Sequence, residues 1–166
     1  DPINADFQIA AGKARSRGFE FDLNGEIAPN LDLWVSYAYV DAQITNDVAD
    51  PNFGLPVPAG SPLLNIPDHT LNVQLAYTAE VANRDVRFGG GVLHVGERLG
   101  ELGRDFDLPA YTLARLFAEG EIGGGVRLRL DIDNLFNTRW FANSFSQLWV
   151  LPGTPRTARV TASYTF

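Results

Sequence analysis

The stretch TARVTASYTF, residues 157–166, alternates between two kinds of side chain along its whole length. Its apolar members are Ala158, Val160, Ala162, Tyr164 and Phe166, and the residues between them are polar. Period-two alternation is typical of a β-strand whose two faces meet different environments. The stretch therefore predicts either a two-faced sheet of a soluble protein or a membrane strand with lipid on one side and water on the other.

The same alternation recurs upstream and predicts an all-β protein. It is clearest in VRLRLDID, residues 126–133, where Arg127, Arg129, Asp131 and Asp133 are separated by aliphatic residues. We expect about seven strands, at residues 7–27, 31–44, 66–78, 85–97, 109–121, 125–137 and 156–166. The first is long, and its glycines predict a bulge near residues 12–18.

The connections between these strands are short and long in strict alternation. Residues 29–30, 79–84 and 122–124 are short, whereas residues 45–65, 98–108 and 138–155 are longer. An up-and-down antiparallel barrel has this asymmetry when one rim carries tight turns and the other carries loops. A Greek-key sandwich would mix the two lengths, so an up-and-down barrel is favoured.

Composition excludes several classes of protein. The 166 residues contain no cysteine, so neither a disulfide nor a cysteine metal site is possible. The apolar runs are far shorter than the roughly 20 residues of a membrane helix. A formal net charge of −7 disfavours a nucleic-acid partner. Because the chain starts at Asp1-Pro2 and lacks methionine, we expect a processed chain or a fragment.

Strand length and aromatic placement favour a membrane barrel over a soluble one. The predicted strands reach about 10 residues, as tilted membrane strands do, against about 5–6 in globular sheets. Aromatic rings near strand ends on the apolar face fit an interfacial girdle: Tyr37, Tyr39, Tyr77, Tyr164 and Phe166. The alternative is a soluble lipocalin-like barrel with these rings inside.

Six segments, in order, resemble the late barrel of TonB-dependent outer-membrane receptors of the ferric-siderophore type. They are GKARSRGFEFDLNGEIAPNLDLWVSYAYVDAQITND, NIPDHTLNVQLAY, GGGVLHVGER, LPAYTLARL, LDIDNLFNTRWF and PGTPRTARVTASYTF. The resemblance implies a 22-stranded transmembrane barrel with an N-terminal plug. It further implies a bacterial outer-membrane transporter rather than an enzyme, with a ferric siderophore as cargo and the TonB–ExbB–ExbD complex as partner. Contacts with outer-membrane lipid and lipopolysaccharide are also implied.

The chain departs from that pattern because it shows neither a plug nor more than seven strands. We therefore expect residues 1–166 to form one C-terminal segment of the barrel, with the plug and earlier strands elsewhere. The resemblance also makes Tyr164 and Phe166 a C-terminal assembly signal. If residues 6–13 formed a separate strand, eight strands would suffice for a small complete barrel, with an adhesin or structural role.

Two groups of side chains are candidate site residues. The connection 138–155 crowds aromatic and polar residues that we expect to contact ligand: Trp140, Phe141, Phe145, Gln147 and Trp149. For Trp140 and Phe141, an extension of the girdle is the alternative. The second group faces the lumen, where it would pair with the plug or with neighbouring strands: Arg115, Arg127, Arg129, Asp131 and Asp133.

No catalytic, metal or cofactor site is predicted. The two histidines, His69 and His94, lack the spacing of a zinc motif. The triplets Gly89–Gly91 and Gly123–Gly125 lack the context of a phosphate loop and are better explained as turns or bulges. A barrel enzyme would need a Ser/His or Asp/His group at the rim. A receptor for another cargo, such as a cobalamin, haem or glycan, stays open.

Overall fold

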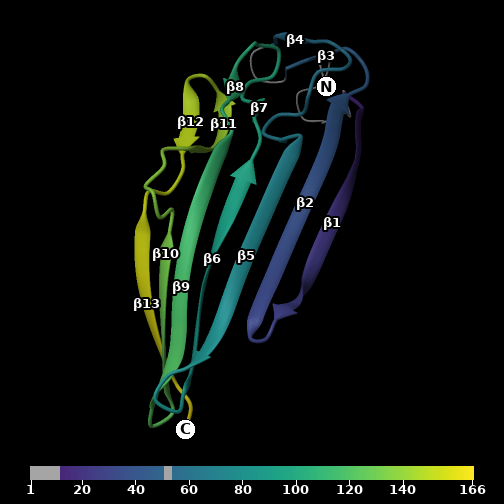
Figure 1. Ribbon diagram of the computed structural model, residues 1–166. Coiled ribbons are helices and arrows are strands. Elements are labelled where there is room, and N and C mark those ends of the chain that lie inside the picture. The colour runs from purple at the N-terminus through teal and green to yellow at the C-terminus, as the bar shows by residue number, and fades with distance from the viewer. Residues whose placement is uncertain (1–11, 51–53) are drawn as a thin grey trace.

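A seven-stranded antiparallel sheet forms the body of the molecule (Figure 1). The computed structural model describes residues 12–50 and 54–166. The strands of the sheet are β1 (Ala14–Ala28), β2 (Leu31–Ile44), β5 (His69–Glu80), β6 (Asp85–Val95), β9 (Tyr111–Gly123), β10 (Val126–Asp133) and β13 (Thr157–Tyr164). Strands that follow one another in this order are paired, and β1 and β13 are the two edges of the sheet. This is the predicted up-and-down order, and all seven predicted strands are confirmed.

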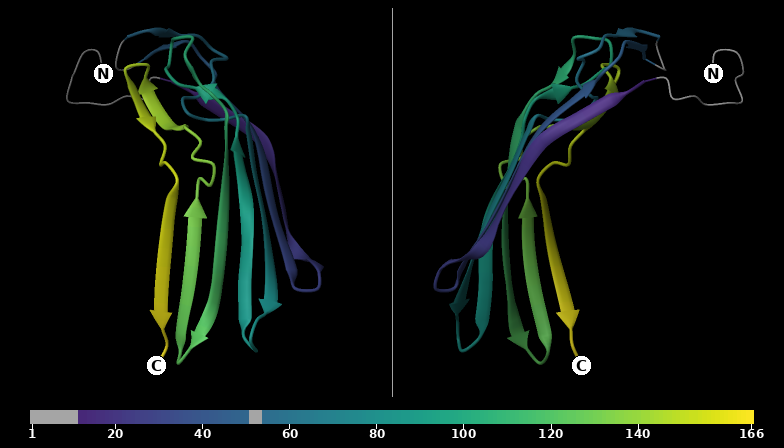
Figure 2. Two further views of the ribbon diagram at one scale, coloured as in Figure 1. Left: turned by 60° about the vertical axis from the view of Figure 1, so that its left-hand side comes forward. Right: turned by 90° about the vertical axis from the view of Figure 1, so that its right-hand side faces the viewer.

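The two ends of the sheet differ as the connection lengths predicted. Tight turns join β1 to β2, β5 to β6 and β9 to β10 at one end, where the chain also finishes (Figures 1 and 2). Residues with positive φ form these turns: Asn30 (62°), Ala82 (52°), Asn83 (57°) and Gly124 (61°). The three long connections gather at the other end.

Three short hairpins within the long connections were not predicted. They are β3 (Val48–Ala49) with β4 (Pro56–Val57), β7 (Arg98–Leu99) with β8 (Asp107–Leu108), and β11 (Phe141–Ser146) with β12 (Trp149–Pro152). The first two pairs have two residues in each strand, which is too short for alternation to appear in the sequence. The long connections are therefore folded structures in their own right.

Two predictions about strand shape are wrong. The predicted strand 125–137 ends at Asp133, because Asn134 and Asn137 take positive φ (50° and 53°). The predicted bulge near residues 12–18 is absent from the described part, where the register runs without a shift from Ala14↔Ile44 to Glu26↔Asp32. Gly18 serves another purpose, since a Cβ there would collide with the carbonyl oxygen of Tyr39.

The first predicted strand begins partly outside the described residues, as does the alternative with eight strands. Residues 7–11 belong to that part. The alternative places a turn in GKARSR, yet the structure pairs Ala14 to Arg17 with β2 as ordinary strand. The described residues therefore do not support a turn there. They also contain no helix long and apolar enough to cross a membrane.

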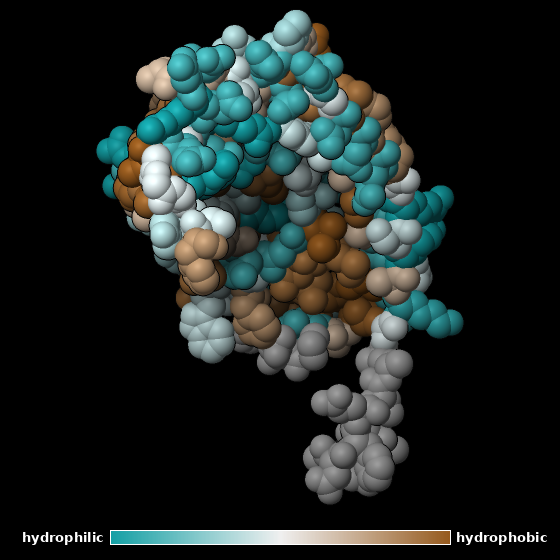
Figure 3. Space-filling model, turned by 90° about the horizontal axis from the view of Figure 1, so that it is seen from below, coloured by the Kyte–Doolittle hydropathy of each residue, from teal (hydrophilic) through white to brown (hydrophobic). Residues whose placement is uncertain are grey.

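In a soluble protein the apolar face of a sheet is buried, whereas in this sheet the apolar face is exposed. Its exposed large apolar residues share one face: Phe19, Phe21, Leu23, Leu75, Tyr77, Phe88, Val92, Leu116, Leu128, Leu130, Val160 and Tyr164. The opposite face is polar, yet it contains the buried Ala76 and Phe117, which are 1% and 7% exposed. Viewed from the short-turn end, the hollow at the middle is bordered by hydrophilic residues on one side and by hydrophobic residues on the other (Figure 3). An exposed apolar band around a polar interior is the pattern of a lipid-facing barrel wall.

Candidate functional site: the lumenal wall and the loop cap

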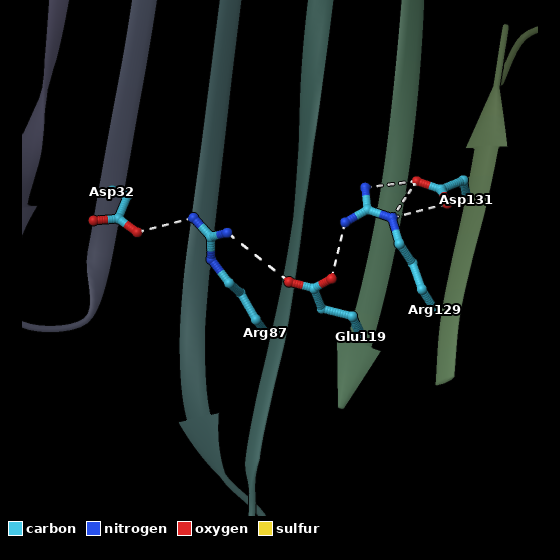
Figure 4. Close-up of polar contacts among 5 residues, drawn as sticks. All are labelled: Asp32, Arg87, Glu119, Arg129 and Asp131. Atoms are coloured by element: carbon cyan, nitrogen blue, oxygen red, sulfur yellow. Dashed lines mark hydrogen bonds and ion pairs between the residues drawn. The ribbon is translucent and has the colours of Figure 1, made fainter. Parts of the chain in front are cut away.

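Five charged side chains on the polar face form a charge ladder across β2, β6, β9 and β10 (Figure 4). In order they are Asp32, Arg87, Glu119, Arg129 and Asp131, so that opposite charges alternate. The closest N–O distances are 3.1 Å, 3.9 Å, 2.9 Å and 2.7 Å along this order. The register places them in reach of one another, because Glu119 lies opposite both Arg87 and Arg129.

The ladder is also packed against aromatic rings. The guanidinium of Arg87 lies 5.2 Å from the ring centre of Trp34, and that of Arg129 lies 4.9 Å from the ring of Phe117. Cations over aromatic faces gain a favourable electrostatic contact. Arg129 and Asp131, predicted to face the lumen and pair there, thus pair within the wall itself.

A second lumenal arginine, Arg115, lies along the wall. It donates to the side-chain oxygen of Gln74 on β5, and on the way it crosses β6 above Gly91. A Cβ on Gly91 would lie 3.3 Å from Nε of Arg115, so glycine leaves room for this path. Phe117 covers Gly89 in the same way, with a ring carbon 2.9 Å from the position of a Cβ.

The remaining lumenal candidates are placed on the polar face without an ion pair within the described residues. Arg127 lies between Glu121 and Ser163 in the register. Asp133 borders a hollow of about 270 Å³ that Asn72, Leu93 and Arg115 also line. The structure therefore brings Arg115 and Asp133 to one hollow, and leaves Arg127 nearer the short turns.

The described parts of the three long connections, residues 45–50 with 54–68, 96–110 and 134–156, dock together and form a loop cap. Asn65 of the first connection donates to the carbonyl of Ser144 in the third (2.7 Å) and accepts from its N–H (2.9 Å). The N–H of Asn65 also donates to the carbonyl of Leu99 in the second connection (2.9 Å). Ser144 in turn donates its hydroxyl to the carbonyl of Gly100.

Two buried charges strengthen the cap. Arg98, which is 5% exposed, donates to the carbonyls of Phe141 (2.6 Å) and Ala142 (3.2 Å). Its guanidinium lies 5.4 Å from the ring of Tyr111, and its Nη1 has no partner within the described residues. Glu101, which is 3% exposed, accepts from the N–H of Gln147 and from Arg104. Arg98 and Glu101 thereby hold the hairpin β11–β12 against the second connection, residues 96–110.

The predicted ligand-contacting residues divide into two sets. Trp140 packs on Tyr111 with 4.6 Å between ring centres, and its Nε1 donates to the carbonyl of Thr154. Phe145 and Trp149 face each other at 6.0 Å on the open side of the hairpin, where Trp149 is 70% exposed. Gln147 lies at the hairpin turn, and Phe141 is also exposed. Contact with cargo stays a prediction for all five.

Four further residues singled out in the sequence lie on strands or at the short-turn end. Tyr164 and Phe166 stack at 6.2 Å at the short-turn end, and their role in assembly stays a prediction. His69 accepts from or donates to the hydroxyl of Tyr37 (2.8 Å), and His94 pairs with Thr112 (2.9 Å). Within the described ranges, no cluster of three potential metal ligands occurs.

Sequence reasoning missed Asn65, Arg98, Glu101 and Ser144. They lie outside the alternating segments, and their partners are up to 79 residues away in the sequence. Asn65 has a φ of 61°, a conformation in which asparagine is enriched. That preference is the one local signal that the sequence offered for this site.

The sequence pattern of the family "TonB dependent receptor-like, beta-barrel" matches residues 1–135. The chain belongs to this family of TonB-dependent receptors. Its members are outer-membrane receptors and transporters, so the seven strands cross the outer membrane with their apolar face toward lipid. The predicted family, fold and location are thereby confirmed.

Similar proteins of known function are receptors and transporters of the same family. The chain is 36% identical to the metal-pseudopaline receptor CntO of Pseudomonas aeruginosa, over 99% of this chain and 23% of that receptor. It is 23% identical to the ferrichrome outer membrane transporter/phage receptor of Escherichia coli K12, over 100% of this chain and 22% of the transporter. It thus spans less than a quarter of the length of these curated relatives.

Solved receptors share the fold. BauA, the ferric preacinetobactin receptor of Acinetobacter baumannii, superimposes with a TM-score of 0.77 at 22% identity, over 94% of this chain and 23% of BauA. The siderophore receptor PiuA of the same organism gives 0.76 at 24% identity, over 91% and 22%. The described sheet corresponds to the C-terminal part of such barrels.

Proposed function

We propose that this chain forms barrel wall and extracellular loops of a transporter that imports ferric siderophores across the outer membrane. A loop cap would capture the chelate, and a plug moved by TonB with ExbB–ExbD would release it inward. The observation that carries this proposal is the exposed pair Phe145 and Trp149, held by the loop cap at the entrance of a polar lumen. The role of this chain is binding and passage rather than catalysis.

Contact with cargo would combine aromatic and polar groups. Exposed aromatic residues in a well-anchored position are typical of recognition hot spots. The hairpin β11–β12 presents Phe145 and Trp149, and Gln147 adds an amide at its turn. A metal chelate with an organic shell offers complementary apolar and hydrogen-bonding surfaces. Several similar proteins are named as receptors for ferric siderophores or related chelates.

A second candidate cargo is a metal complex of the pseudopaline kind. The relative at 36% identity is named as a metal-pseudopaline receptor, whereas the ferrichrome and ferrioxamine relatives are 23% and 22% identical. An uptake assay with the intact receptor separates the two. A deletion strain carrying the intact receptor would receive radioactive iron as ferrichrome or ferrioxamine, or a radioactive metal ion as its pseudopaline complex.

The expected result is receptor-dependent uptake of one of these complexes that is lost when TonB is absent. Trp149→Ala should weaken binding at least tenfold, since hot-spot aromatics contribute more than about 1.4 kcal/mol. Phe21→Ala, on the lipid-facing side of β1, is the matched aromatic control and should leave affinity unchanged. Uptake of haem, cobalamin or a glycan in place of these complexes would overturn the siderophore assignment.

We also propose contact with lipopolysaccharide at the outer rim. Arg15 and Arg17 point to the lipid-facing side of β1 at its loop-cap end, directly above Phe19, and have no ion pair among the described side chains. Cations next to an apolar band match the level of lipid phosphates. Replacing both by glutamine should reduce lipopolysaccharide that co-purifies with the receptor. An unchanged lipid content would argue against the contact.

A further inference from the structure

Asn65 is the junction at which all three connections of the loop cap meet. Its backbone N–H donates to the carbonyl of Leu99, and its side-chain amide both donates to and accepts from the backbone of Ser144. The three distances are 2.9 Å, 2.7 Å and 2.9 Å. One half-buried residue of the first connection thereby contacts the second and the third.

The chemistry of asparagine fits this junction in two ways. Its φ of 61° lies in the left-handed region, which asparagine tolerates better than most residues with a Cβ. Its side chain carries one carbonyl and one NH₂, so it pairs with Ser144 as a neighbouring strand residue would. Aspartate has no donor for the Ser144 carbonyl, and glycine would keep the backbone conformation but lose the amide.

The contact between Asn65 and Ser144 anchors the buried face of the hairpin β11–β12, which is opposite the face that carries Phe145. Ser144 is 4% exposed and lies in β11, one residue before Phe145. Because neighbouring residues of a strand point to opposite faces, anchoring Ser144 on the cap turns Phe145 to the open side. Trp149 lies past the register irregularity between Ser144 and Ser146, is 70% exposed, and has its ring centre 6.0 Å from that of Phe145.

We propose that Asn65 is a positioning residue for cargo capture. It holds the hairpin β11–β12 so that Phe145 and Trp149 meet the organic shell of a metal chelate in a preformed orientation. Ordering two side chains before binding removes an entropic cost of association. This inference rests on the proposed function for its cargo, and on the structure alone for the anchoring of the hairpin.

The test uses Asn65→Ala in the intact receptor, with two measurements. Hydrogen exchange in detergent reports the hairpin directly, and residues 143–147 should exchange at least tenfold faster in the variant. Equilibrium binding of ferrichrome and of a metal–pseudopaline complex reports capture, and the Kd of the bound complex should rise about tenfold. In a Trp149→Ala background the same change should have little further effect, because Asn65 acts through the hairpin.

The control is Asn83→Gly, which removes another asparagine with positive φ, in the turn at the opposite rim. It should leave hairpin exchange and affinity unchanged. A residue needed only for folding would lower the amount of folded receptor, but would leave the Kd and the coupling to Trp149 unchanged.

Unchanged hairpin exchange in Asn65→Ala overturns the inference, as does a loss of affinity that adds fully to that of Trp149→Ala. If the wild-type receptor binds neither complex, the proposed cargo is wrong. The exchange measurement then still decides whether Asn65 anchors the hairpin, so the two failures are distinguishable.

Discussion

Leu130→Arg should destabilise the barrel strongly, because Leu130 lies near the middle of β10 on the lipid-facing side. Its register partners, Ala118 and Val160, are also apolar and face the same way. A guanidinium at this depth cannot reach either headgroup region easily, and arginine at the bilayer midplane of a barrel costs about 2–4 kcal/mol. At 1.4 kcal/mol per tenfold change, the ratio of folded to unfolded receptor falls roughly 30-fold to 700-fold.

The assay is a guanidinium titration of the intact receptor in lipid vesicles, with the folded fraction read from gel migration without heating. Ser36→Arg is the matched control, since Ser36 is in the sheet on the lumenal face and lies opposite Asp22 in the register. Ser36 is exposed on this polar face, so we expect a stability near that of the wild type. Equal stability of Leu130→Arg and Ser36→Arg, or a greater loss in the latter, would refute the assignment of the two faces.

Three further changes test the wall and the cap, each by the same titration. Glu119→Gln removes the central carboxylate of the charge ladder and should lower stability by about 1–2 kcal/mol, because two arginines lose their shared partner. Gly89→Ala should cost more than about 2 kcal/mol, since its Cβ would collide with the carbonyl of Leu75 and approach Phe117. Asn134→Ala should cost about 2–4 kcal/mol and speed proteolysis after β10, because the buried amide bonds Thr138 and Thr154.

Each of these changes has a control of the same residue type. Glu20→Gln removes a lumenal carboxylate without an ion pair among the described residues. Gly25→Ala adds a Cβ with no atom within 4 Å, and Asn24→Ala truncates an exposed amide on β1. All three controls should match the wild type. If a control variant lost as much stability as the variant it is matched with, the contact named for that variant would not explain its loss of stability.

Much of the fold was predictable because successive residues of a barrel strand alternate between lipid and the lumen, and their polarity alternates accordingly. The alternation in VRLRLDID placed the charged residues on one face, and the register confirms that division. Strand ends were less predictable. Asn134 ends β10 through its own hydrogen bonds to Thr138, and such a contact leaves no trace in a period-two pattern.

The site was predictable only in part. The aromatic residues of β11–β12 stood out by composition, and the lumenal arginines by alternation. Their partners depended on tertiary structure. Arg87 reaches across β5 to Asp32, two strands away, and Asn65 meets Ser144 across 79 residues of sequence. A local sequence pattern cannot reveal a contact between two residues that lie in different connections, as Asn65 and Ser144 do.

The glycines of β6 shape the lumenal surface of the sheet. Because Arg115 crosses above Gly91 and Phe117 covers Gly89, two bulky lumenal side chains lie flat along the strand beside them. A larger residue at either glycine would push the side chain beside it away from the sheet, toward the axis of the barrel. Two residues without a side chain thus determine how far Arg115 and Phe117 reach into the lumen.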